Sequence, residues 1–168
     1  MTTAEILAQI MGICGIIIFI IMFHFGSMKN VLKMKMTMDI FWALHFLLIG
    51  ATSAFATNMI CFIRENVFIR NDKKFFGAKA WLWIFIAFNL ISAVFTWKGY
   101  YSILPAIASS LATYSFWQKN VKVARIIGFS NNIMMFTYDI FAGSLMGIIG
   151  ETLAFLSVII AMYRNRDK

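Results

Sequence analysis

The sequence predicts an all-α polytopic membrane protein with seven transmembrane helices. Of its 168 residues, 61% are hydrophobic and only 13% are charged, and the mean hydropathy is +0.80, which excludes a soluble globular core. Fourteen of the fifteen Lys and Arg residues lie in or beside every second gap between the apolar segments. Cationic residues gather in this way on the cytoplasmic side of membrane proteins.

Each apolar segment approaches the roughly 20 residues that a helix needs to cross a bilayer. The expected spans are residues 4–25, 31–49, 53–69, 80–97, 100–117, 126–142 and 145–163. The first lacks the basic start of a signal peptide. The second is the least apolar, but without it the basic segment 70–79 would fall on the wrong side. The third follows the tight connection 50–52, and only Lys98 separates the fourth from the fifth. The last two precede the basic C-terminus.

Alternating charge also predicts the orientation. With seven spans, the N-terminus lies outside and the C-terminus in the cytoplasm. The formal charge of +8 therefore reflects contact with a lipid bilayer, and nucleic acid is not an expected partner. Arg64, Lys33 and Lys35 lie near the cytoplasmic ends of their spans, so we expect their side chains to extend to that interface.

A weak internal sequence repeat suggests that the single domain, residues 1–168, contains two related parts. Shifting the sequence by 93 residues overlays His45 on Tyr138, Gly50 on Gly143 and Asn58 on Glu151. Two parallel three-helix bundles, residues 4–70 and 100–163, would then be joined by a linker helix at 80–97. Transporter folds are often built from such repeats.

Polar residues inside the expected spans are the candidate binding residues. Glu151 lies about 9 Å below the outer boundary at helical rise, where a carboxylate is costly to bury. It is either a solute or proton site or a buried hydrogen bond that joins two helices. Asn58 lies at a similar depth in the third span, with the same two interpretations.

Four further residues extend this candidate site. His45, which could respond to protons, and Tyr138 lie towards the outer ends of their spans. Asp39 and Asn132 lie about 16 Å from the outer ends. Asp39 could instead pair with Lys35, four residues before it, and so be structural. Asp139 shares a helical face with Asn132.

Catalytic and metal-binding signatures are missing from the sequence. There is no His-Glu-x-x-His motif, no Gly-x-Ser-Gly motif, and neither histidine adjoins a nucleophile. We therefore expect no enzyme activity, no cofactor and no metal. A homo-oligomer is allowed but not required, because seven helices can bury their own polar faces.

Three stretches resemble the YgjV-type bacterial inner membrane proteins over about residues 5–166. They are His45-Phe46-Leu47-Leu48-Ile49-Gly50-Ala51 with Ser53-Ala54 and Asn58; Leu104-Pro105; and Ala142-Gly143-Ser144 with Gly147 and Glu151. The resemblance implies an inner-membrane location. The chain is also distantly similar to the PQ-loop and SWEET-like transporters, in which the third helix of each triplet contacts solute. Asn58 and Glu151 occupy those helices here, but the chain has no Pro-Gln pair and only one proline, Pro105.

These observations favour a transporter or permease for a small polar solute. The path would lie between the two bundles, where Asn58 and Glu151 would contact the solute or a coupled proton. The alternative is a non-transporting membrane scaffold, sensor or partner subunit, in which Glu151 only joins helices.

Overall fold

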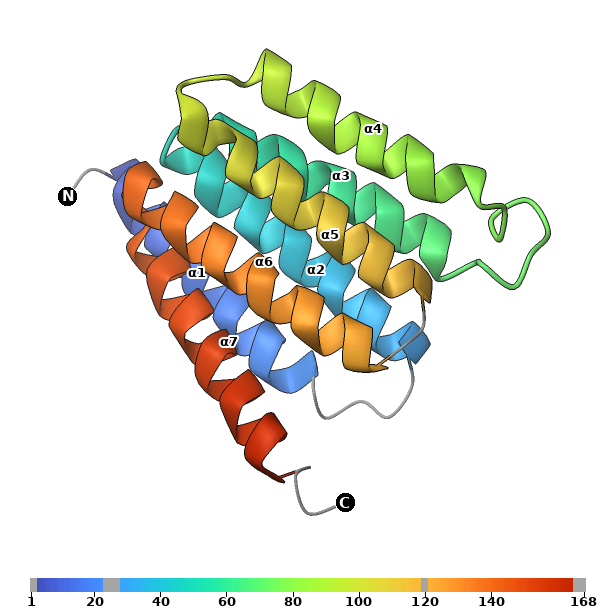
Figure 1. Ribbon diagram of the computed structural model, residues 1–168. Coiled ribbons are helices and arrows are strands. Elements are labelled where there is room, and N and C mark those ends of the chain that lie inside the picture. Colours follow the sequence, from blue (N-terminus) through green and yellow to red (C-terminus); the bar gives the residue numbers. More distant parts are fainter. Residues whose placement is uncertain (1–2, 23–27, 119–120, 165–168) are drawn as a thin grey trace.

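The structure, a computed structural model, describes residues 3–22, 28–118 and 121–164. Within these ranges the chain forms seven α-helices, one short 3-10 turn and no strand, so the all-α prediction is confirmed. The elements are α1 (Thr3–Met22), α2 (Met28–Leu48), α3 (Thr52–Phe68), α4 (Ala80–Phe95), η1 (Tyr100–Ile103), α5 (Leu104–Gln118), α6 (Val121–Ala142) and α7 (Leu145–Arg164) (Figure 1).

The helices differ from the expected spans mainly at their basic ends. α2 begins at Met28 and α6 at Val121, earlier than the predicted 31 and 126, because the basic residues there continue the helix. Lys and Arg are good helix formers, so a loss of hydropathy need not end a helix. The fifth segment instead begins as η1, and Pro105 lies in the first turn of α5, where its missing N–H leaves no bond unmade.

The helices form two sets, α1–α3 and α5–α7, and within each set neighbours in the chain pack against one another. α2 packs against α1 and α3, and α6 packs against α5 and α7. The two sets meet where α1 contacts α7 and where α3 contacts α5, while α4 lies outside, against α3 and α5 (Figure 1). Among the described residues α2 and α6 make no close backbone contact, which leaves space between them for side chains and a cavity.

Two tight turns of the same conformation join α2 to α3 and α6 to α7. Gly50 has φ of 74° and Gly143 has φ of 67°, the left-handed region in which glycine carries no penalty. The N–H of Ala51 donates to the Phe46 carbonyl at 2.8 Å, and the N–H of Ser144 donates to the Asp139 carbonyl at 2.9 Å. The residues of the second turn lie 93 positions after those of the first, which is the shift of the internal sequence repeat. Common ancestry of the two parts stays a prediction.

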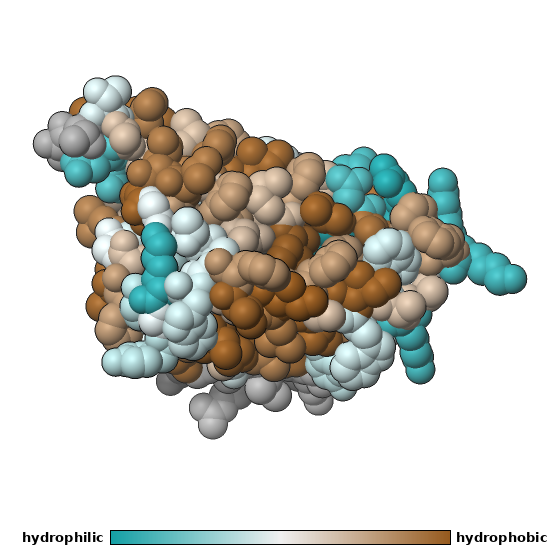
Figure 2. Space-filling model, turned by 90° about the horizontal axis from the view of Figure 1, so that it is seen from above, coloured by the Kyte–Doolittle hydropathy of each residue, from teal (hydrophilic) through white to brown (hydrophobic). Residues whose placement is uncertain are grey.

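The outer surface is strongly apolar. Trp83, Val94 and Phe95 on α4 are 66%, 72% and 85% exposed, and a row of isoleucines on α1 is about half exposed. Figure 2 shows apolar residues covering the middle of the face seen from above, with hydrophilic residues gathered towards its ends. Such extensive apolar surface is typical of contact with lipid or with another protein.

By length and composition, only α1 among the described residues could cross a membrane alone, over Thr3–Ile21. The apolar stretches Ala80–Phe95 and Leu145–Leu156 are shorter. Seven spans therefore remain a prediction.

Candidate functional site

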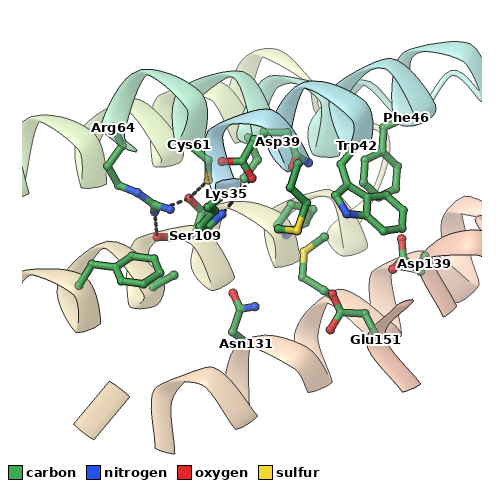
Figure 3. A pocket seen from close by; sticks show the side chains of 18 of the residues that line it. Lys35, Asp39, Trp42, Phe46, Cys61, Arg64, Ser109, Asn131, Asp139 and Glu151 are labelled. Carbon is green, nitrogen blue, oxygen red and sulfur yellow. Dashed lines mark hydrogen bonds and ion pairs between the residues drawn. The ribbon is translucent and has the colours of Figure 1, made fainter. Parts of the chain in front are cut away.

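A cavity of about 250 Å³ lies between α2, α3, α5, α6 and α7 (Figure 3). Its ionisable lining groups are Lys35, Asp39, Arg64, Asp139 and Glu151, together with Cys61. Ionisable groups are costly to bury in an apolar bundle, so their convergence on one cavity makes it the candidate functional site.

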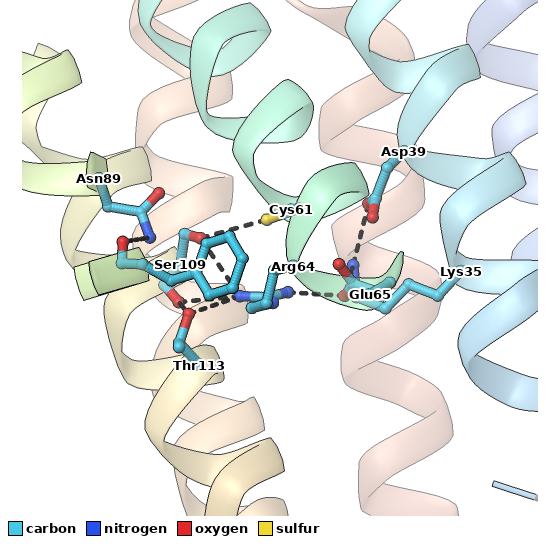
Figure 4. Close-up of polar contacts among 9 residues, drawn as sticks. Lys35, Asp39, Cys61, Arg64, Glu65, Asn89, Ser109 and Thr113 are labelled. Carbon is cyan, nitrogen blue, oxygen red and sulfur yellow. Dashed lines mark hydrogen bonds and ion pairs between the residues drawn. The ribbon is translucent and has the colours of Figure 1, made fainter. Parts of the chain in front are cut away.

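Arg64 and Lys35 form one charged end of the cavity. The Arg64 Nη2 atom lies 2.7 Å from Glu65 Oε1, and the Lys35 Nζ atom lies 2.9 Å from Asp39 Oδ1 and 3.5 Å from Glu65 Oε1 (Figure 4). Arg64, Glu65 and Asp39 are at most 2% exposed. Two cations and two carboxylates therefore neutralise one another within the protein, and the predicted Lys35–Asp39 pair is present.

Arg64 also joins α3 to α5. Its Nη1 atom donates to the Ser109 carbonyl at 3.1 Å and to Thr113 Oγ1 at 2.7 Å, and its guanidinium lies 5.3 Å from the centre of the Phe116 ring. The expectation that Arg64 extends to the cytoplasmic interface is wrong, because partners on α5 hold it inside. Lys35 is likewise turned inward at 16% exposure, whereas Lys33 is exposed.

Asp139 and Glu151 lie at the other end of the cavity, on α6 and α7 (Figure 3). Asp139 is 1% exposed, and its carboxylate packs directly on the Cα atom of Gly147. Its Oδ1 atom has no hydrogen-bond partner within the part of the chain that the structure describes. The rings of Trp42 and Phe46 line the same end, stacked with their centroids 5.8 Å apart. This end thus combines carboxylates with aromatic rings.

Asn58 and Glu151, the two residues predicted to contact solute, both line the cavity. The Asn58 Nδ2 atom donates to the Ala54 carbonyl of its own helix at 2.8 Å. That bond leaves the side-chain carbonyl oxygen of Asn58 as the acceptor available for a solute. Asp39 also reaches the cavity, as predicted, but as the partner of Lys35.

His45 and Tyr138 lie outside the cavity lining and join helices. The two ring nitrogens of His45 lie 2.8 Å from the Ala8 carbonyl and 2.8 Å from Ser144 Oγ, so the ring bridges α1 and α7. Tyr138 accepts a hydrogen bond from the Ala54 N–H at 3.4 Å. Both side chains are at most 2% exposed. Their hydrogen bonds join neighbouring helices, and solute contact by His45 and Tyr138 stays a prediction.

Asn132 does not line the cavity, but its neighbour Asn131 does. Successive residues on a helix point about 100° apart, so a one-residue error changes the face. Sequence reasoning also missed Glu65 and Trp42. The signal for Glu65 was its position next to Arg64 in an apolar segment, since two adjacent charges at such a depth require partners inside the protein.

The geometry defines an all-helical protein with an apolar exterior and an internal cavity lined by ionisable groups. Comparison with protein families then identifies the family to which the chain belongs. The chain belongs to the Imp-YgjV family, described as bacterial inner membrane proteins, whose model matches residues 6–168. No curated protein and no solved structure matches the chain. The resemblance stated from the sequence motifs is therefore confirmed, and with it the inner-membrane location.

Proposed function

We propose that this protein is a multi-pass transporter of a small polar solute, which passes through the cavity between the helix sets α1–α3 and α5–α7. The single observation that carries the proposal is the cavity itself, about 250 Å³ and lined by five charged side chains and Asn58. Polar groups inside a membrane protein typically mark solute or ion pathways. Transporter sites also commonly lie between repeated bundles, with a residue from the same position in each.

The proposal includes a duplication that pairs Asn58 with Glu151 across the cavity. In support, α2 and α6 end in equivalent turns, and α1–α7 and α3–α5 are equivalent contacts under the shift of 93 residues. His45 on α2 contacts the start of α7, and Tyr138 on α6 contacts the start of α3. The two contacts are therefore equivalent, because each joins the second helix of one part to the third helix of the other. Helix α4 would be the linker of this 3+1+3 arrangement.

Transport is tested with purified protein in liposomes and a panel of labelled amino acids, sugars, nucleosides, organic acids and small organic cations. We expect saturable uptake of at least one of these solutes. The combined change Glu151→Gln and Asn58→Ala should weaken its apparent affinity about tenfold or more, because a hydrogen bond to a charged group contributes about 1.5–3 kcal/mol. Uptake that depends on a pH gradient should lose that dependence in Glu151→Gln.

The matched control is Asp72→Asn, which alters an exposed carboxylate in the segment between α3 and α4. It should transport like the unaltered protein. Full transport by the Glu151→Gln and Asn58→Ala protein would refute the site. Absence of uptake across the panel, with Glu151→Gln only less stable, would favour the non-transporting scaffold or subunit, for which the hydrogen bonds of His45 are the supporting observation.

Topology gives a second test of the proposal. We propose seven spans with the N-terminus outside and the C-terminus in the cytoplasm, because Lys98 is the one basic residue in the predicted outer gaps. Green fluorescent protein fused after residue 168 should fluoresce, and alkaline phosphatase fused there should be inactive. Fusions at Lys98 should give the reverse result. Active phosphatase at the C-terminus would contradict this orientation.

A further inference from the structure

The two ends of the cavity differ in how their charges are compensated. At one end Arg64 and Lys35 are paired with Glu65 and Asp39, so that two positive and two negative charges balance. At the other end the Asp139 carboxylate makes no ion pair with any described residue, although it is 1% exposed and lines the cavity. A buried carboxylate without a partner is costly, and a bound cation would relieve that cost.

Aromatic rings accompany this carboxylate. Trp42 and Phe46 line the cavity beside Asp139, as Figure 3 shows. Phe46 is 2% exposed, held between Trp42 and Tyr138, with ring centroids 5.8 Å and 6.3 Å away. Aromatic faces attract organic cations, most strongly where water is excluded, and indole is the best such face. A carboxylate beside indole and phenyl rings is a chemical environment suited to an alkylammonium group.

Size restricts the solute further. A volume of about 250 Å³ corresponds to about eight water molecules at roughly 30 Å³ each. A small alkylammonium compound such as choline fits this space, whereas a nucleotide does not. Glu151 on α7 lines the same end and adds a second carboxylate. An anionic solute would be repelled from this end of the cavity.

We propose that the cavity binds a small organic ammonium compound, with its cationic head between the Asp139 carboxylate and the rings of Trp42 and Phe46. This inference names the solute class of the proposed transport site and rests on that proposal for its physiological meaning. As a binding site it can be tested without any transport.

Binding is measured by calorimetry on protein in nanodiscs of zwitterionic lipid, with choline and tetramethylammonium as probes. The comparison ligand is 3,3-dimethyl-1-butanol, which has the shape of choline without its charge. Choline should bind saturably and the neutral alcohol should not. Asp139→Asn and Trp42→Leu should each weaken choline binding about tenfold or more, whereas Asp72→Asn should leave it unchanged.

A loss of choline binding caused by misfolding can be told from a loss of the site itself, because only misfolding also lowers the thermal stability. Asp139→Asn removes an unpaired buried charge, so its thermal stability should be equal to or above that of the unaltered protein while choline binding falls. Equal binding of choline and its neutral isostere, or unchanged choline binding in Asp139→Asn, would overturn the proposal. Saturable choline binding without uptake of any solute of the panel would refute the transport proposal and leave the ammonium site standing. Uptake of another solute by a protein that does not bind choline would do the opposite.

Discussion

Replacing Arg64 by Met is expected to destabilise the protein by about 3–5 kcal/mol, the usual cost of breaking a buried ion pair. Glu65 is fully buried, and without Arg64 the one cation left beside its carboxylate, among the described residues, is Lys35 at 3.5 Å. On α5 the Thr113 hydroxyl loses the Arg64 donor, and the Ser109 carbonyl keeps only the bond from Thr113 Oγ1 among those of the described side chains. Met fills a similar volume, so the loss reports the charge and its hydrogen bonds rather than an empty space. The measurement is the free energy of unfolding in mixed detergent micelles.

Arg70→Met is the matched control, since Arg70 is exposed just after α3 ends. Its guanidinium lies 5.8 Å from the centre of the Phe76 ring, an exposed contact, so the free energy of unfolding should change by at most about 1 kcal/mol. Adding Glu65→Gln to Arg64→Met should recover part of the loss, because the stranded carboxylate is then neutral. A similar small loss in Arg64→Met and Arg70→Met would show that Arg64 lies at the interface after all.

Adding one methyl group at Gly147 is expected to have the second-largest effect. A Cβ atom there would lie 2.5 Å from both carboxylate oxygens of Asp139, a distance that van der Waals contact forbids. Gly147→Ala must therefore displace the Asp139 side chain or separate α6 from α7, at a cost of about 1–3 kcal/mol. Choline binding should fall with it, because the carboxylate leaves its position beside the aromatic rings. Thermal unfolding and calorimetry measure the two effects.

The second-site variant Asp139→Ala makes this prediction specific. With the carboxylate removed, the methyl group at position 147 has room. Alanine is favoured over glycine by up to about 1 kcal/mol in a helix, and by less in a first turn such as that of α7, so in this background Gly147→Ala should be neutral or slightly stabilising. An equal penalty in both backgrounds would mean that the methyl group clashes with something other than Asp139, and the close contact described here would be wrong.

The positions of the helices were largely predictable from the sequence. α3 and α7 begin within one residue of the expected spans, because apolar segments about 20 residues long are visible in one dimension. The early starts of α2 and α6 were not predictable in this way. Hydropathy marks where the apolar part of a helix begins, whereas the backbone hydrogen bonds of these helices begin earlier, in their basic segments. The turns at Gly50 and Gly143 were marked by the residues themselves.

The candidate site was predictable only in part. Asn58 and Glu151 were identified because a polar residue in an apolar segment is conspicuous, and both line the cavity. Arg64 was misplaced because its distance from the end of α3 suggested that it could reach the interface. Its partners Ser109 and Thr113 are more than 40 residues away in the chain.

The sequence by itself determined the all-helical class, the family and the set of polar residues that must be accommodated inside. These properties depend on composition and on local periodicity, which one chain displays completely. Only the tertiary structure decided which of those residues meet. It paired Arg64 with Glu65, turned Asn131 rather than Asn132 into the cavity, and set Asp139 beside Trp42. The reason is geometric: each residue step turns a helix by about 100°, and the rotation of one helix against another depends on packing between distant segments.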